Sequence, residues 1–78
     1  MSYSWVPARS GAIEAEPHKG SRFILRVQKV DGEGWYATVG GNDVDEGEAF
    51  ASAEEAQAAA EASYDGYYID FEEPTEGF

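Results

Sequence analysis

The sequence lacks cysteine altogether and contains a single histidine, His18. Disulfide bonds and thiolate zinc sites are therefore excluded. A catalytic site in which a histidine activates a serine nucleophile would have to use this single histidine, and there is no cysteine nucleophile. His18 lies between Pro17 and Lys19, where we expect a surface loop. These absences predict a non-catalytic protein with no cofactor and no assigned metal ligand.

Long apolar runs are also missing. Met1 is followed by Ser-Tyr-Ser-Trp, which has neither the basic start nor the apolar stretch of a signal peptide, and no segment approaches the roughly 20 apolar residues of a membrane-spanning helix. We therefore expect a cytoplasmic protein. A hydrophobic content of 42% and an aromatic content of 14% are too high for a disordered chain and predict one small folded domain.

Basic residues are absent after Lys29. All five of them precede residue 30, together with two acids, whereas the chain from Val30 to Phe78 contains fourteen acids and brings the net charge to -11. Such a field repels nucleic acids and anionic membranes, and it attracts basic protein surfaces. The expected partner is a basic protein surface, without direct contact to nucleic acid or membrane.

Alternating apolar side chains predict a hairpin in the middle of the chain. Phe23, Leu25 and Val27 alternate with polar residues, and a second alternating run covers residues 35–39 after a Gly-rich turn at residues 31–34. Residues 43–50 predict a poorer third strand, with Gly47 as a weak point. Residues 1–20 show no sustained period, and we interpret them as a loosely attached arm whose aromatic side chains dock on the domain.

A helix is predicted next, because Ser52-Ala-Glu-Glu55 fits a capping box and an alanine-rich stretch follows as far as about Tyr64. Gly66 is expected to end the helix in a left-handed conformation. Tyr67, Ile69 and Phe71 then alternate as the inner face of a last strand. The prediction is an α+β fold, β-β-β-α-β, in which a three- to four-stranded antiparallel sheet carries one helix on one face. Residues 21–72 form this domain, and residues 73–78 form an acidic tail.

Clustered carboxylates raise two chemical alternatives. Paired Asp or Glu side chains can perform acid-base catalysis, but they need a cleft that raises one carboxyl pKa, which a domain of this size hardly provides. Asp43, Asp45 and Glu54 also match positions one, three and twelve of an EF-hand calcium loop. The required glycine is displaced to Gly47 at position five, and Ala49 occupies position seven. A surface cation site stays open as an alternative.

The acidic surface itself has three interpretations that composition does not separate. It can serve solubility or adaptation to high salt, it can dock a basic partner protein, or its carboxylates can take the place of DNA phosphates in a nucleic-acid-binding channel. Tyrosines among the acids favour an interface, because they bury area and keep a hydrogen-bonding group. The residues predicted to contact a partner are Asp43, Asp45, Glu46, Glu48, Glu54, Glu55, Glu61, Asp65, Tyr68, Asp70, Glu72, Glu73 and Glu76.

The stretch WYATVGGNDVDEGEAFASAEEAQAAAEA resembles small bacterial and phage domains in which a Trp-containing hairpin is followed by a Gly, Phe, Ser, Glu-Glu-Ala pattern and an alanine-rich helix. The matching residues are Gly47, Phe50, Ser52, Glu54, Glu55 and Ala56. This resemblance covers under half of the chain. It concerns capping and packing, so it implies a fold and says little about function.

As a whole, an acidic chain of under 100 residues without catalytic residues is similar in type to phage-encoded anti-CRISPR and anti-restriction proteins. That resemblance implies a protein that acts in the bacterial host cytoplasm. It would bind and inhibit a nucleic-acid-binding complex, such as a CRISPR effector, by presenting carboxylates to the DNA-binding surface. The alternative is an accessory or structural bacterial or phage domain, with a homodimer formed through a sheet edge and acidity that serves solubility.

Overall fold

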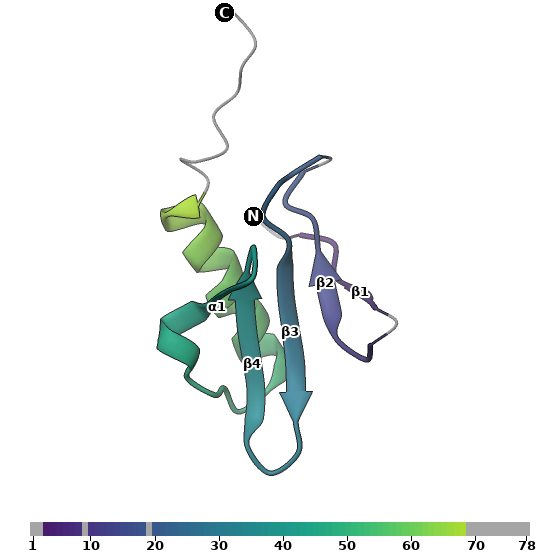
Figure 1. Ribbon diagram of the computed structural model, residues 1–78, viewed down its shortest axis with the longest axis vertical. Helices are drawn as coiled ribbons and strands as arrows, with labels where there is room; N and C mark the ends of the chain where they lie inside the picture. Colours follow the sequence, from purple (N-terminus) through teal and green to yellow (C-terminus); the bar gives the residue numbers. More distant parts are fainter. Residues whose placement is uncertain (1–2, 9, 19, 69–78) are drawn as a thin grey trace, which may run out of the picture.

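The computed structural model describes residues 3–8, 10–18 and 20–68, in which five strands precede one α-helix (Figure 1). The strands pair antiparallel in chain order, β1-β2-β3-β4-β5, and α1 packs mainly on β3 and β4. The fold is therefore α+β with one helix on one face of the sheet, as predicted. The elements are β1 (Val6–Pro7), β2 (Ile13–Ala15), β3 (Leu25–Val30), β4 (Gly34–Val39), β5 (Asn42–Asp43), the 3-10 helix η1 (Val44–Gly47) and α1 (Ala53–Gly66).

The predicted hairpin forms the centre of the sheet. β3 and β4 pair in a register that places Leu25 opposite Val39 and Val27 opposite Ala37. These four side chains are buried on the face that α1 covers. Because successive strand residues point to opposite faces, Arg26 and Thr38, which also pair, lie on the outer face. No described helix covers that outer face (Figure 1).

The turn between β4 and β5 consists of Gly40 and Gly41 alone, because Val39 pairs with Asn42. Both glycines have positive φ angles, 60° and 87°. A two-residue hairpin turn of this kind requires positive φ at both positions, which side chains with a Cβ atom rarely adopt. The two glycines thus fix where the chain reverses and enters the acid-rich residues that follow.

The N-terminal residues differ from the loosely attached arm that we expected for residues 1–20. Residues 6–7 and 13–15 are hydrogen-bonded strands, and β2 pairs with β3 through Ile13 opposite Val27 and Ala15 opposite Leu25. Ala12 and Ala15 are buried. Strands of two and three residues are too short to show a period of two, so the sequence pattern could not reveal them.

The third strand expected at residues 43–50 is also largely absent. Only Asn42–Asp43 pair with β4, and the chain then turns through η1, where Val44 enters the core. Phe50 returns to the sheet as an isolated bridge, in which it exchanges two backbone hydrogen bonds of 2.7 and 2.9 Å with Trp35. Asp, Glu and Gly have low strand propensity, and the five residues between Val44 and Phe50 are of these types or alanine.

The helix begins where the capping signal places it. The Ser52 hydroxyl accepts the Glu55 N–H at 3.2 Å, while Glu55 Oε1 accepts the N–H of Ala51 at 3.3 Å rather than that of Ser52. The helix runs to Gly66, two residues past Tyr64. Gly66 does not adopt the expected left-handed conformation, since it is absent from the described glycines with positive φ.

The core lies between the sheet and a face of α1 that consists of small residues. Ala56 and Ala60 are fully buried and Tyr64 is 1% exposed. Leu25, Val27 and Val39 face them from the sheet, while Phe23, Trp35 and Phe50 are half-buried at the margins. Small side chains let the helix approach the sheet closely, so the single large residue of the helix face, Tyr64, fills much of the remaining space.

The last strand that we expected is not present as far as the structure describes the chain. Tyr67 and Tyr68 follow α1 outside any strand, and Ile69 and Phe71 lie beyond the described residues. The prediction placed Tyr67 on the inner face of this strand and Tyr68 on the exposed side, and the observed burial is the reverse. Tyr67 is 58% exposed, whereas the Tyr68 ring is half-buried against Phe23, with 5.1 Å between ring centroids.

Candidate acidic docking surface

Six of the predicted contact residues form one acid-rich stretch between β5 and the first turn of α1. All six are exposed, and none has an ion-pair partner among the described residues. We call them the acidic segment: Asp43, Asp45, Glu46, Glu48, Glu54 and Glu55. Because η1 packs on both β4 and α1, the segment is attached to the folded core rather than to a loose end.

Asp45 and Glu46 have left-handed backbone conformations, with φ of 53° and 60°, and Gly47 follows with φ of 83°. A left-handed residue with a Cβ atom costs about 1–2 kcal/mol. The turn is kept because Val44 is buried directly before it and the Glu48 N–H donates to the Asp45 carbonyl at 3.2 Å. Strained backbone of this kind is concentrated at functional positions, which motivates the hypothesis that these two carboxylates contact a partner.

Glu54 and Glu55 have a local explanation as well. Both lie in the first turn of α1, where the free N–H groups and the helix dipole favour negative charge. Glu55 also accepts the Ala51 N–H. The two glutamates therefore stabilise the helix whether or not they meet a partner, and the strongest candidates for a purely external role are the acids of residues 43–48.

Glu61 and Asp65 form hydrogen bonds with side chains of the N-terminal residues. Glu61 Oε2 accepts the indole N–H of Trp5 at 2.7 Å, and Asp65 Oδ1 accepts the Tyr3 hydroxyl at 2.6 Å. The Tyr3 ring stands edge-on to Tyr64, with centroids 6.1 Å apart. Burial, the hydrogen bond to Asp65 and nearby negative charge raise the pKa of Tyr3. These acids hold the N-terminal residues on α1.

The sequence predicted that the aromatic side chains of residues 1–20 dock, but it did not identify Glu61 and Asp65 as their partners, although a signal was present. Tyr3 and Trp5 are two residues apart, the spacing of one strand face, and Glu61 and Asp65 are four apart, the spacing of one helix face. Two such pairs can meet when a strand lies along a helix. Of the remaining predicted contact residues, Tyr68 packs on Phe23, and Asp70, Glu72, Glu73 and Glu76 lie outside the described residues.

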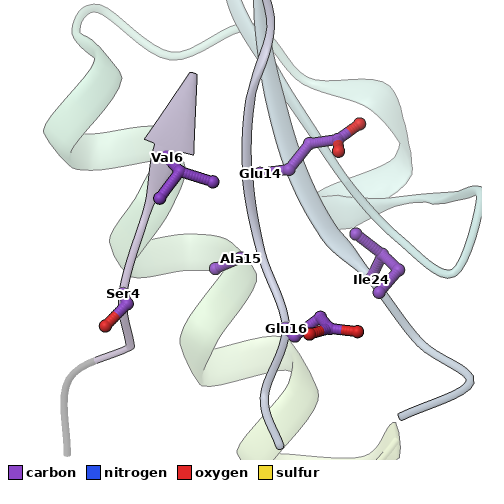
Figure 2. A pocket seen from close by; sticks show the side chains of 6 residues that line it. All are labelled: Ser4, Val6, Glu14, Ala15, Glu16 and Ile24. Atoms are coloured by element: carbon purple, nitrogen blue, oxygen red, sulfur yellow. The ribbon is translucent and has the colours of Figure 1, made fainter. Parts of the chain in front are cut away.

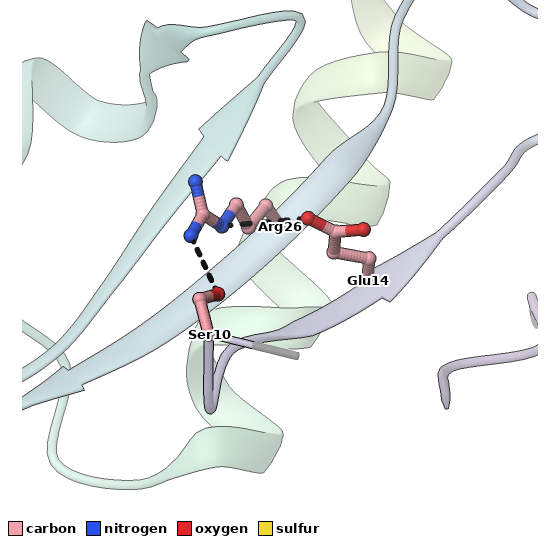
Figure 3. A network of polar contacts seen from close by, with 3 residues as sticks. All are labelled: Ser10, Glu14 and Arg26. Carbon is pink, nitrogen blue, oxygen red and sulfur yellow. Dashed lines mark hydrogen bonds and ion pairs between the residues drawn. The ribbon is translucent and has the colours of Figure 1, made fainter. Parts of the chain in front are cut away.

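The outer face of the sheet is a second surface that the sequence did not reveal. The strand register places Val6, Glu14, Arg26, Thr38 and Asp43 in one row across all five strands. Figure 3 shows the Arg26 guanidinium between its two partners, with Nε 3.5 Å from Glu14 Oε2 and Nη2 donating to Ser10 Oγ at 2.9 Å. The row thus contains one basic side chain, Arg26, and two acids, Glu14 and Asp43.

Two adjacent hollows occupy this face. The larger, of about 510 Å³, lies over β1 and β2 and is lined by Val6, Glu14, Glu16 and Ile24 among others (Figure 2). The smaller, of about 260 Å³, lies over β3 and the turn after β4, and Glu14 and Ile24 line it too. Its other side chains include two arginines, so we call it the arginine hollow: Glu14, Arg22, Ile24, Arg26, Thr38, Gly40 and Gly41.

The residues that the structure describes contain no group of three or more metal-ligating side chains. Within the same residues, no helix has the length and apolar character needed to cross a membrane. No family model, curated protein or solved structure matches the chain. Function is therefore inferred from the residues themselves.

Proposed function

We propose that the protein is a non-catalytic binding protein whose acidic segment docks on a basic surface of a nucleic-acid-binding protein complex and inhibits it. An anti-CRISPR protein that blocks the DNA-binding surface of a CRISPR effector is the specific form of this proposal. The observation that carries it is the pair Asp45 and Glu46, two adjacent exposed carboxylates held in left-handed backbone conformations.

Three features support a docking surface over acidity that serves solubility alone. The acids of the segment all lie within residues 43–55, and the segment packs on the core through η1 and α1. No described base neutralises any of them. A fixed cluster of one sign accelerates association with an oppositely charged surface and sets its orientation, whereas solubility needs no strained turn.

The decisive variant neutralises Asp45→Asn together with Glu46→Gln. Asparagine tolerates a left-handed conformation, so the turn is expected to persist. Exposed charge pairs contribute about 0.2–1 kcal/mol each, and loss of two should weaken binding about tenfold and lower its salt dependence. The matched control, Glu16→Gln with Asp31→Asn, removes the same charge at two other exposed acids and should leave affinity nearly unchanged.

The experiment has two stages. The full chain and the double variant are used to capture partners from bacterial lysate, and each captured complex is then purified and tested for nucleic-acid binding with the protein as competitor. The proposal requires that excess protein displaces the nucleic acid and that the Asp45/Glu46 variant does so less well. Capture of partners that bind no nucleic acid, or equal competition by both proteins, contradicts it.

A further inference from the structure

Gly34, the first residue of β4, lies where another part of the backbone comes close to the strand. A Cβ atom added to it would stand 2.7 Å from the Phe50 carbonyl oxygen and 3.5 Å from the Ala49 Cβ. Its φ of 120° is also one that residues with a Cβ atom rarely adopt. Glycine is therefore the residue that fits this position while the Phe50 carbonyl stays in place.

The Phe50 carbonyl oxygen is held there by the residue that follows Gly34. It accepts the Trp35 N–H at 2.9 Å, and the Phe50 N–H donates to the Trp35 carbonyl at 2.7 Å. We call these two hydrogen bonds between Trp35 and Phe50 the Phe50 bridge. The atom that a Cβ at position 34 would meet belongs to the backbone, so the clash is relieved only when the strand moves or the bridge breaks.

The Phe50 bridge is one of two anchors for residues 45–49. Val44 is the other anchor, because it is buried in the core directly before them. Without the bridge, the next element that joins the core is α1, which begins at Ala53. The bridge therefore shortens the stretch that is free to move, and this stretch contains half of the acidic segment: Asp45, Glu46 and Glu48.

We propose that Gly34 positions the acidic segment for its partner, by admitting the Phe50 bridge that holds these three carboxylates in one arrangement. This inference rests on the proposed function, and it adds an uncharged residue from outside the segment. A binding group that is already held in its bound arrangement loses less conformational entropy on association. Gly34 has no side chain to contact a partner, so it acts through the segment alone.

Backbone 15N relaxation of the unbound full chain tests the positioning without a variant or a partner. The amides of residues 45–49 should have order parameters of about 0.85, the value of rigid backbone, and should match those of β3 and β4. Order parameters below about 0.6, which are typical of flexible backbone, would overturn the proposal. In that case the segment would have no fixed arrangement for Gly34 to maintain.

Gly34→Ala is the decisive variant, and Gly32→Ala is its matched control. Gly32 lies in the same turn and has a positive φ of 81°, but a Cβ added to it meets no atom within 4 Å. Both substitutions place alanine in a conformation that it rarely adopts, and only the first acts on the Phe50 carbonyl. The order parameters of residues 45–49 should fall in Gly34→Ala alone. Equal order parameters in the two variants contradict the proposal.

A second pair of variants decides the matter if Gly34→Ala does not fold. Phe50→Pro removes the N–H that donates to the Trp35 carbonyl and leaves position 34 unchanged. Phe50→Ala, its control, removes the same ring and keeps the N–H. Residues 45–49 should be more mobile in Phe50→Pro than in Phe50→Ala, and equal mobility would show that the bridge does not hold them.

The binding measurement uses the complex captured in the competition experiment. Gly34→Ala keeps the net charge of -11, so electrostatic steering persists and the association rate constant should stay within about twofold of wild type. The dissociation rate constant should rise about tenfold, because the segment is no longer preorganised. Asp45→Asn with Glu46→Gln should instead slow association, since it removes charge.

The two proposals fail in different ways. A Gly34→Ala variant with mobile residues 45–49 and an unchanged dissociation rate constant overturns the positioning role and leaves the proposed function standing. Equal competition by wild type and the Asp45/Glu46 variant contradicts the proposed function instead. The relaxation measurements report on the Phe50 bridge in either case, because they are made on the unbound chain.

Discussion

At the scale of single residues, the clearest division is between acids that face solvent and acids that bind within the chain. Asp45 and Glu46 are exposed, whereas Glu61 and Asp65 each accept a hydrogen bond from an N-terminal aromatic residue. All four look alike in sequence. Only the position of Tyr3 and Trp5 along α1 separates them, so neutralising substitutions at Glu61 or Asp65 would loosen the N-terminal residues as well as change charge.

Tyr3→Phe is the residue-scale test of this contact, because it keeps the ring against Tyr64 and removes the hydroxyl that Asp65 accepts. We expect the free energy of unfolding at pH 7 to fall by about 0.5–1 kcal/mol, as for a partly exposed hydrogen bond. Urea unfolding followed by tryptophan fluorescence measures it. An unchanged free energy of unfolding would show that the hydrogen bond contributes no net stability.

The same pair of proteins gives a pH dependence. In the folded protein, burial and the neighbouring Asp65 raise the pKa of Tyr3 above its ordinary value of 10.0. A group whose pKa is higher when folded stabilises the fold below the unfolded pKa, and that stabilisation is lost as the pH rises from there toward the folded value. The stability difference between wild type and Tyr3→Phe should therefore shrink above pH 10. Other titrating groups cancel in this difference, and a constant difference would contradict the assignment.

At the scale of elements, α1 was the best-predicted part of the chain and residues 43–50 the worst. The start of the helix follows from a local signal, since Ser52 accepts the N–H of Glu55 three residues later. The path of residues 43–50 depends instead on non-local contacts, because Val44 enters the core and Phe50 forms a backbone bridge to Trp35. Local sequence carries the first kind of information and not the second.

The close approach of α1 to the sheet predicts a sharp contrast between two alanines. Ala60 is fully buried against the sheet and Ala58 is exposed. Leucine at position 60 adds volume to a filled interface and should cost about 1–3 kcal/mol, whereas Ala58→Leu should change stability by about 0.5 kcal/mol or less. Thermal unfolding of both variants measures this. Equal stabilities would mean that the helix can move away from β3 and β4 without cost.

At the scale of the whole molecule, charge is distributed unequally over two surfaces. Arg22 and Arg26 lie on the outer sheet face with Glu14 and Asp43, while the other acids of the acidic segment lie at η1, in the residue that follows it and in the first turn of α1. The sheet edges that a homodimer would use are two-residue strands, and β1 contains Pro7. Short edges and proline hinder edge-to-edge pairing, so the docking proposal is favoured over the dimer, which stays a prediction for light scattering to test.

Self-repulsion at a net charge of -11 predicts that added salt stabilises the fold. Raising NaCl from low concentration to about 0.3 M should increase the free energy of unfolding by about 1 kcal/mol, or the melting temperature by about 4–8 °C. The gain should then level off, because screening is nearly complete. The Asp45→Asn, Glu46→Gln variant should show a smaller gain. A rise that continues into molar salt would instead indicate adaptation to high salt.

The sequence by itself determined the α+β class, the central hairpin, the start of α1 and the acidic character of the chain after residue 30, because strand periodicity, capping and charge are local properties. Only the tertiary structure decided that residues 6–7 and 13–15 join the sheet and that Tyr68 is more buried than Tyr67. It also decided that Glu61 and Asp65 form hydrogen bonds with Trp5 and Tyr3. Each of these depends on contacts between segments more than 40 residues apart or on strands too short to show a period. Such contacts are fixed when the sheet and helix close on one core, and no local pattern encodes them.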